Sequence, residues 1–266
     1  MVSGRRLHIW VIAGTLCILL LTFPGCSTED TNSQYADNPI AERETLSQVS
    51  TIEALMEGLY DGVITYGELE KYGDFGIGTF DGLNGEMVGF DGNFYQVRTD
   101  GIAYEVSDTM TAPFADVTFF DADLRQDLPE GLNYEQIKDY VDGVLPTVNI
   151  FHAIKINGTF SYMKARSVPA QEKPYPPLDE VIQRQTTFVF NDIEGTMVGF
   201  RCPEFVTDIN VPGYHLHFLT GNRDAGGHVL DFVVEDAVVS VDHTSDFYMI
   251  LPAEGSGFYE TNFTAN

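Results

Sequence analysis

The stretch Gly213-Tyr-His-Leu-His-Phe218, followed after a polar segment by Gly226-Gly-His-Val-Leu230, holds three of the chain's six histidines. In its first part, histidines alternate with apolar residues, which is the period of a half-buried β-strand. Because side chains alternate across a strand, His215 and His217 should share one face while the apolar residues between them point into the core. The glycine-rich segment that follows is typical of a hairpin turn, so a second strand should return His228 to the same side.

Two histidines on one strand and a third on its hairpin partner form a pattern that can bind a metal. Neutral imidazoles suit Zn²⁺, with nitrogens at about 2.0–2.1 Å, and three of them leave positions open for substrate or water, as in catalytic sites. Other first-row divalent metals accept the same ligands. We therefore expect His215, His217 and His228 to hold one divalent cation, with Zn²⁺ as the first candidate. The alternative is that each is an ordinary surface or core histidine.

Hydrophobic patterns along the rest of the chain switch between helical and strand periods. Apolar residues at helical spacing predict helices at residues 51–60, 66–72 and 134–144. Alternating β-branched and aromatic residues predict strands at 94–98, 115–120, 150–156, 159–163, 187–190, 196–201, 214–219, 229–234 and 237–241. The balance indicates a strand-rich α+β fold with mixed sheets. We expect two related αβ halves, at residues 47–146 and 147–266, of which the second binds the metal.

A short internal repeat singles out one carboxylate. Gly85-Glu-Met-Val-Gly-Phe90 recurs as Gly195-Thr-Met-Val-Gly-Phe200, with Glu86 in the first copy where the second has Thr196. A carboxylate in an apolar strand is costly to bury unless it is paired or takes part in chemistry. Glu86 is therefore a candidate functional residue.

The first 26 residues resemble an export signal. Two arginines precede an apolar run, Ile9 to Phe23, which is short for a membrane span but suits a signal peptide. The run ends at Phe23-Pro-Gly-Cys26, which partly matches a lipoprotein processing site, so we expect a lipid anchor at Cys26; ordinary cleavage nearby is the alternative. Polar residues 27–46 are expected to form a disordered tether. The folded part should then be exported and lie outside the cytoplasmic membrane.

Charge and cysteine content limit the partners. The chain has 40 acidic and 14 basic residues, a net charge of −26, which disfavours nucleic acid and anionic lipid surfaces as partners. Contact with a membrane is expected only through the anchor. Beyond Cys26 the chain has a single cysteine, Cys202, so the folded part can form no internal disulfide.

Four groups of motifs, taken together and in order, carry a resemblance to a known family. The chain resembles the alpha-acetolactate decarboxylases from about Thr51 to Pro252. The matching stretches are Gly73–Thr79, Asn84–Met87, Lys164–Pro169 with Pro174–Pro176, and Asn210–Phe218 continued by Gly226–Leu230.

This resemblance implies a function and a set of site residues. It implies metal-dependent decarboxylation of (S)-2-acetolactate to (R)-acetoin and CO₂, with the metal stabilising an enediolate, in a protein commonly assembled as a homodimer. His215, His217 and His228 would bind the metal. Glu86 and Arg166 would be catalytic groups, and Arg166 would also bind the substrate, with Thr79 nearby.

Other interpretations stay open from the sequence. Glu86 could orient a ligand histidine instead of moving a proton, and Arg166 could be an interior ion-pair partner. The family also places a glutamate from its C-terminal tail at the site, and here only Glu254 and Glu260 are available, neither with a convincing match. Two other functions remain possible: a zinc hydrolase of an ester or amide, and a non-catalytic extracytoplasmic binding lipoprotein.

Overall fold

The computed structural model describes residues 44–263 of the chain. The predicted signal peptide, Cys26 and most of the predicted tether lie outside these residues. The tether was predicted to run to residue 46, and its end is wrong: Thr45 and Leu46 are buried in strand β1 (Thr45–Val49). They are ordered because β1 pairs with two other strands and Leu46 joins the core. No helix within residues 44–263 is long and apolar enough to cross a membrane.

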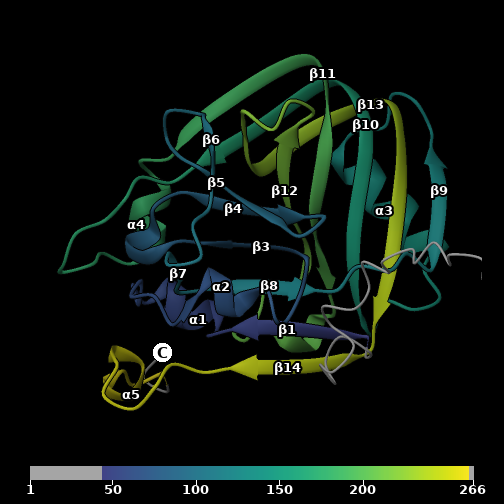
Figure 1. The fold of residues 1–266 in the computed structure, drawn as a ribbon. Coiled ribbons are helices and arrows are strands. Elements are labelled where there is room, and N and C mark those ends of the chain that lie inside the picture. The colour runs from purple at the N-terminus through teal and green to yellow at the C-terminus, as the bar shows by residue number, and fades with distance from the viewer. Residues whose placement is uncertain (1–43, 264–266) are drawn as a thin grey trace, which may run out of the picture. The chain divides into compact units, whose positions relative to one another are not determined.

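A seven-stranded sheet contains most strands of the N-terminal part, in the order β14-β1-β8-β3-β4-β5-β6 (Figure 1). β1 pairs with β14 in parallel, and the other neighbours are antiparallel, so the sheet is mixed as expected. The remaining strands are β3 (Phe75–Thr79), β4 (Glu86–Phe90), β5 (Asn93–Val97), β6 (Ala103–Glu105), β8 (Ala115–Thr118) and β14 (Asp246–Ile250). A separate two-stranded ladder is formed by β2 (Ile64–Thr65) and β7 (Thr111–Ala112).

A five-stranded antiparallel sheet contains the histidine hairpin. Its order is β10-β11-β12-β13-β9, and β13 also pairs with β10 along most of its length. The sheet therefore curls, so that the start of β13 meets β12 while the rest meets β10. Its strands are β9 (Leu124–Leu128), β10 (Phe151–Ser167), β11 (Thr186–Cys202), β12 (Gly213–Thr220) and β13 (Gly226–Thr244).

Three of these strands are longer than predicted. Each of β10, β11 and β13 unites two segments that the sequence pattern separated. The polar residues between the segments interrupt the hydrophobic alternation without interrupting the ladder. For example, Gly158 of β10 pairs with Ala237 of β13, and Thr159 pairs with Asp236.

The longest helix, α3 (Tyr134–Val144), has the predicted bounds. Asn133 and Gln136 form a capping box at its N-terminus, which satisfies two backbone amides. The helix lies beside the five-stranded sheet (Figure 1), and its Ile137 and Val141 are buried in a cluster with residues of that sheet. The other two predicted helices are shorter than expected, because α1 (Ile52–Met56) stops before left-handed Gly58 and α2 (Tyr66–Leu69) is a single turn; α4 (Leu178–Ile182) and α5 (Gly257–Glu260) were not predicted.

The two sheets share a core, and each includes a strand from the other half of the sequence. One buried cluster joins Ile77 and Val88 of the seven-stranded sheet to Val198 and Phe200 of the other. β9 and α3 precede residue 146 yet belong with the five-stranded sheet, while β14 follows it and joins the seven-stranded one. The strand-rich α+β class with mixed sheets is confirmed, whereas the division at residue 146 stays a prediction.

A buried carboxyl group in β8 gives the fold a pH dependence. Asp116 is fully buried, and its two oxygens accept hydrogen bonds from Nδ2 of Asn210 at 3.0 and 3.1 Å. Burial raises the pKa of Asp116 from 3.8 to about 7, although the bond from Asn210 opposes this shift. The folded state therefore binds a proton that the unfolded state has lost, and this contribution to stability disappears as the pH rises from about 4 to about 7.

We expect Asp116→Asn to reduce the loss of stability between pH 5 and pH 8. The wild-type free energy of unfolding should fall by up to about 3 kcal/mol more than that of the variant across this window, because about two pKa units of the shift lie above pH 5 and one pKa unit corresponds to about 1.4 kcal/mol. Urea unfolding of both proteins at the two pH values measures the difference. Parallel pH profiles would contradict the role of Asp116.

Candidate active site

The structure brings the three histidines together at the junction of the two sheets. β12 forms where the alternation predicted it, with Leu216 and Phe218 in the core on the other face. His217 pairs directly with His228 across the β12–β13 ladder. The backbone approaches closely here, because a Cβ on Gly227 would lie 2.4 Å from the carbonyl oxygen of Arg166.

The spacing of the imidazoles fits one bound cation. The ring centroids of His215, His217 and His228 lie 5.0 to 5.2 Å apart, and one ligand atom from each lies within 4.8 Å of the others. Nε2 of His217 is 3.3 Å from Nδ1 of His228. Two nitrogens bound to one tetrahedral ion at about 2.0–2.1 Å would be separated by about 3.3 Å.

Hydrogen bonding also leaves the nitrogens free for a cation. Nδ1 of His217 donates to the carbonyl oxygen of Met87 at 2.6 Å, which fixes the tautomer and leaves the lone pair on Nε2. Nδ1 of His215 is buried and has no hydrogen-bond partner among the described residues. Burial lowers the pKa of His215 to about 3, with a smaller effect from the Arg166 charge, and it lowers the pKa of His217 and His228 well below the usual value. All three rings are therefore neutral near pH 7, as metal ligands must be.

Glu86 and Arg166 form an ion pair beside the histidines. Nη1 of Arg166 donates to Oε1 of Glu86 at 2.7 Å, and both side chains are largely buried. The other oxygen of Glu86 lies 3.7 Å from Nε2 of His217. Burial raises the pKa of Glu86, while the positive charge of Arg166 opposes that shift. Since His217 is already oriented by the Met87 carbonyl, Glu86 is not needed as its hydrogen-bond acceptor.

The backbone around Glu86 explains how a carboxylate comes to point into this site. Gly85 has a left-handed φ of +89°, and a Cβ there would lie 2.3 Å from the carbonyl oxygen of Val97. Thr79 pairs with Glu86 across the β3–β4 ladder, and its hydroxyl donates to the carbonyl oxygen of Gly85 at 2.7 Å. Thr79 thus stabilises the turn that leads into Glu86 and also lines the cavity.

These groups meet at a cavity of about 280 Å³. Its polar lining includes the three histidines, Glu86, Arg166 and Thr79; the rest of the lining is mainly apolar and comes from α1, α4 and other segments. The apolar lining residues are Ile52, Leu55, Met56, Leu83, Phe114, Val168, Leu178, Ile182 and Val211. Glu254 and Glu260 are both exposed, and neither is among the lining residues. The cavity therefore suits a small molecule with a polar end and an apolar end.

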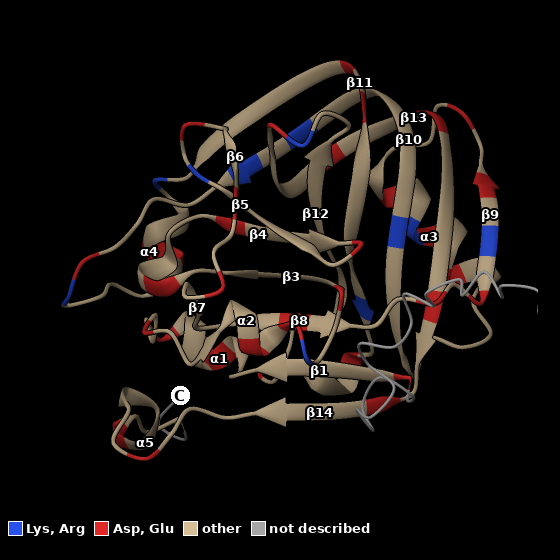
Figure 2. Cartoon of the chain, in the orientation of Figure 1, with Lys and Arg blue, Asp and Glu red and all other residues tan. Residues whose placement is uncertain are grey.

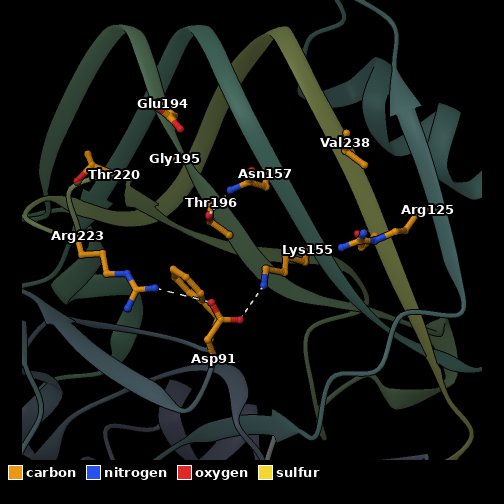
Figure 3. Close-up of a pocket in the computed structure, with 13 residues that line it drawn as sticks. Asp91, Arg125, Lys155, Asn157, Glu194, Gly195, Thr196, Thr220, Arg223 and Val238 are labelled. Carbon is orange, nitrogen blue, oxygen red and sulfur yellow. Dashed lines mark hydrogen bonds and ion pairs between the residues drawn. The ribbon is translucent and has the colours of Figure 1, made fainter.

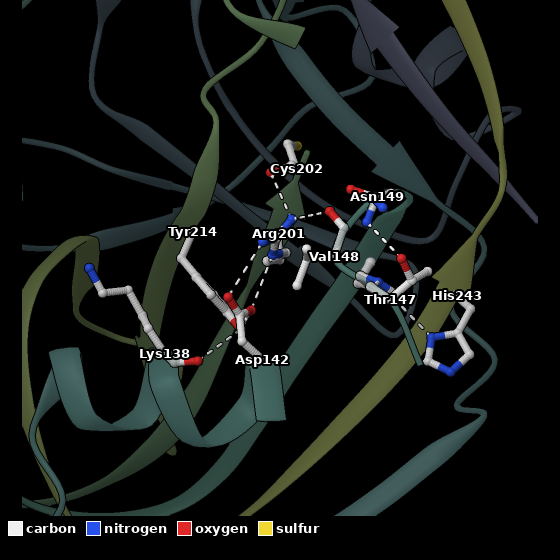
Figure 4. Close-up of polar contacts among 10 residues, drawn as sticks. Lys138, Asp142, Thr147, Val148, Asn149, Arg201, Cys202, Tyr214 and His243 are labelled. Atoms are coloured by element: carbon white, nitrogen blue, oxygen red, sulfur yellow. Dashed lines mark hydrogen bonds and ion pairs between the residues drawn. The ribbon is translucent and has the colours of Figure 1, made fainter. Parts of the chain in front are cut away.

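A polar network links β12, the strand that carries His215 and His217, to α3 (Figure 4). The hydroxyl of Tyr214, next to His215, donates to Oδ1 of Asp142 at 2.7 Å. Nε of Arg201 donates to the same oxygen at 3.2 Å, and Nη1 of Arg201 donates to the carbonyl oxygen of Val148. Because these contacts join α3, β11 and β12, they fix the start of the strand that presents the histidines.

A larger cavity, of about 510 Å³, lies outside the histidine cluster (Figure 3). Its basic residues are already partly neutralised: Asp91 is 3.0 Å from Nζ of Lys155 and 3.8 Å from Nη2 of Arg223. It contains neither the histidines nor Glu86. The smaller cavity is therefore the better candidate active site, since it combines possible metal ligands with a buried ion pair.

The sequence did not identify two features of the site. The Met87 carbonyl that orients His217 is a backbone group, so no residue type signals it. The apolar lining was also missed, although Ile52, Leu55 and Met56 lie in the segment 51–60 whose apolar spacing predicted a helix.

Comparison with known proteins identifies the family of the chain. A family model described as alpha-acetolactate decarboxylase matches residues 46–265. The alpha-acetolactate decarboxylase of Methanosarcina mazei is 50% identical over 248 residues, covering 91% of this chain and 86% of the relative. That of Bacillus subtilis is 41% identical over 226 residues, covering 85% and 87%.

Solved structures with a similar fold include members of the same family. The crystal structure of the alpha-acetolactate decarboxylase from Bacillus subtilis strain 168 superposes with a TM-score of 0.81 at 41% identity, covering 83% of this chain and 94% of that one. A Staphylococcus aureus protein described as similar to alpha-acetolactate decarboxylase gives 0.80 at 34% identity, covering 82% and 94%. With a family model spanning the folded part and relatives this similar, the chain belongs to the alpha-acetolactate decarboxylase family of carboxy-lyases.

Proposed function

We propose that the chain converts (S)-2-acetolactate to (R)-acetoin and CO₂ with a divalent metal held by His215, His217 and His228. The observation that carries this proposal is the convergence of three neutral imidazoles with the Glu86–Arg166 pair in one small cavity. The family's name favours this reaction over the two alternatives from the sequence, an ester or amide hydrolase and a non-catalytic binding protein.

The donor set favours Zn²⁺ as the cation, because three imidazole nitrogens and open positions are typical of catalytic zinc. When bound, the cation would supply a Lewis acid that withdraws electrons from the ketone of the substrate. The protein must then hold the carboxylate, control the proton and exclude water.

Arg166 would hold the substrate carboxylate. Its hydrogen bond to Glu86 uses Nη1, and the guanidinium is a planar fork that can bind a carboxylate through two nitrogens. Such a clamp fixes the bond that breaks relative to the neighbouring carbonyl. Strong binding of the carboxylate alone would not raise kcat, so orientation is the useful contribution.

Glu86 would transfer the proton. Burial favours its protonated form and Arg166 favours its ionised form, so a substrate that engages Arg166 would raise the proton affinity of Glu86. Glu86 would then accept the substrate hydroxyl proton or return a proton to the carbon that CO₂ leaves. Delivery from one side of a fixed substrate would give a single product enantiomer, and the apolar lining would keep bulk water from competing.

We expect Arg166→Lys to lower kcat/KM for acetolactate by about tenfold to a hundredfold. Lysine keeps the positive charge beside Glu86 but offers a point charge instead of a planar fork. Steady-state kinetics measure the loss, and Lys164→Arg, two residues earlier on β10, controls for a basic substitution in this strand. An unchanged kcat/KM would contradict the carboxylate clamp.

The reaction itself is tested with racemic acetolactate. Metal-stripped protein lacking residues 1–26 is titrated with Zn²⁺ while acetoin and CO₂ are measured, and a chromogenic ester is assayed in parallel. We expect acetoin formation to rise to a limit near one equivalent of metal, with half of the racemate consumed rapidly. Ester turnover without acetoin would support the hydrolase, and metal uptake without turnover of either substrate would support the binding protein.

We also propose that the protein is exported, with a lipid anchor at Cys26, and works as a homodimer. Support for export and the anchor comes from the apolar run before Cys26; support for the dimer comes from the family resemblance. Cell fractionation with mass spectrometry of the N-terminal peptide tests the first two. Sedimentation of the protein lacking residues 1–26 tests the third.

A further inference from the structure

Three carboxylates meet where the two sheets join, away from the histidine cluster. Glu44 precedes β1, Asp123 precedes β9, and Asp242 lies near the end of β13. One oxygen from each lies within 4.8 Å of the others. Figure 2 shows acidic segments at this junction of β1, β13 and β14. None of the Lys or Arg ion pairs within residues 44–263 involves these three carboxylates.

Asp242 provides a second, independent observation at this cluster. Its side chain is completely buried, and one oxygen, Oδ2, accepts from the backbone amide of Asp121 at 3.2 Å. The other oxygen, Oδ1, is buried without a hydrogen-bond donor among the described residues. Asp123 is fixed in a similar way, since its Oδ2 accepts from the amide of His243 at 2.8 Å. Each aspartate is therefore held by one oxygen and has a second oxygen available.

A buried anion without a donor, beside two other anions, is unfavourable unless a positive charge enters. We propose that Glu44, Asp123 and Asp242 bind a hard divalent cation, best represented by Ca²⁺. Oxygen ligands suit Ca²⁺, and two oxygens at about 2.3–2.6 Å from one ion can be up to about 5 Å apart. The separation of up to 4.8 Å fits this limit. Water molecules would complete the coordination on the exposed side.

Such an ion would act on stability rather than on the reaction. It would link the segments that lead into β1 and β9 to the end of β13, and so join the seven-stranded sheet to the five-stranded one. A ligand that binds only the folded state raises the melting temperature. The all-oxygen donor set also distinguishes this site from the imidazole site, which favours softer metals.

The competing explanation is a proton shared within the cluster. Burial raises the pKa of Asp242 to about 8, and a hydrogen bond with the side chain of Glu44 and the charges of Glu44 and Asp123 act in the same direction. The carboxylates Asp123 and Asp246 and the imidazole of His243 also lie on the segments around it. Binding should therefore be measured above this pH, at about pH 9, where a proton competes less.

The test is calorimetric titration of Ca²⁺ into zinc-loaded protein at constant ionic strength, together with thermal unfolding. We expect one site with a Kd on the order of 0.1–1 mM and a melting temperature at least about 3 °C higher in 10 mM Ca²⁺. Asp242→Asn, which can keep the bond from Asp121, should lose both responses. Asp236→Asn removes an exposed charge from the same strand and should keep both.

Two further variants test whether Ca²⁺ binds at these carboxylates and not at the imidazole site. Asp123→Asn changes an exposed residue and should weaken Ca²⁺ binding at least tenfold even if Asp242→Asn fails to fold. His217→Ala should keep the full Ca²⁺ response, because its loss affects only the imidazole site. The proposal is overturned if wild type shows neither binding heat nor a thermal shift, or if Asp242→Asn and Asp123→Asn respond like wild type.

Discussion

His217→Ala is expected to lower kcat/KM for acetolactate at least about a hundredfold. His217 is central to the proposed metal site: its Nε2 is 3.3 Å from His228 and 3.7 Å from Glu86, and its other nitrogen is held by the Met87 carbonyl. Two remaining imidazoles would bind the cation weakly and in a different position. Activity and bound metal should therefore fall together.

Metal analysis of the purified variant and steady-state kinetics measure this prediction. His243→Gln is the matched control, because His243 lies on β13 outside the cavity and its ring contacts His152. The control should keep its metal and its activity. If His217→Ala loses its metal but keeps wild-type turnover, the reaction does not depend on this cation.

Glu86→Gln is expected to reduce kcat by about a hundredfold or more while the protein keeps its metal. Positioned acids and bases typically contribute about 10² to 10⁴-fold, and glutamine can neither accept nor return a proton. The substitution preserves the shape of a side chain that is 5% exposed, so the cavity should change little. Glu105→Gln, an exposed glutamate at the edge strand β6, is the control.

Kinetics at saturating metal separate the two roles considered for Glu86. A general acid or base predicts low kcat at every metal concentration. A residue that only orients a metal ligand predicts weaker metal binding with kcat restored by excess metal. Full recovery with excess Zn²⁺ would therefore contradict the proton-transfer role.

The part of the site that local pattern determines could be predicted from the sequence. Alternation at residues 213–218 placed His215 and His217 on one face, and the glycine-rich turn brought His228 back beside them. Glu86 was found because its internal repeat has Thr196 at the same position. These predictions rest on local features of the sequence: the strand alternation, the turn and the short repeat.

The features that depend on distant segments could not be predicted in this way. β14 pairs with β1 from the other end of the chain, and β9 joins the five-stranded sheet, because these pairings follow from packing that no local period encodes. The sequence pattern predicted a break within β10 and another within β13, at polar residues. In the structure these residues still pair across the ladder, so each strand continues. The meeting of Glu44, Asp123 and Asp242 likewise appears only once the strands cross.

The central claim is that three imidazoles bind one divalent cation in the cavity next to Glu86 and Arg166. Anomalous X-ray diffraction from crystals of zinc-loaded protein, collected at the zinc absorption edge, tests it most directly. The account predicts one strong peak about 2.0–2.1 Å from a ring nitrogen of each of His215, His217 and His228. A fully loaded crystal with the zinc elsewhere, or with fewer than three of these rings bound to it, would contradict the account.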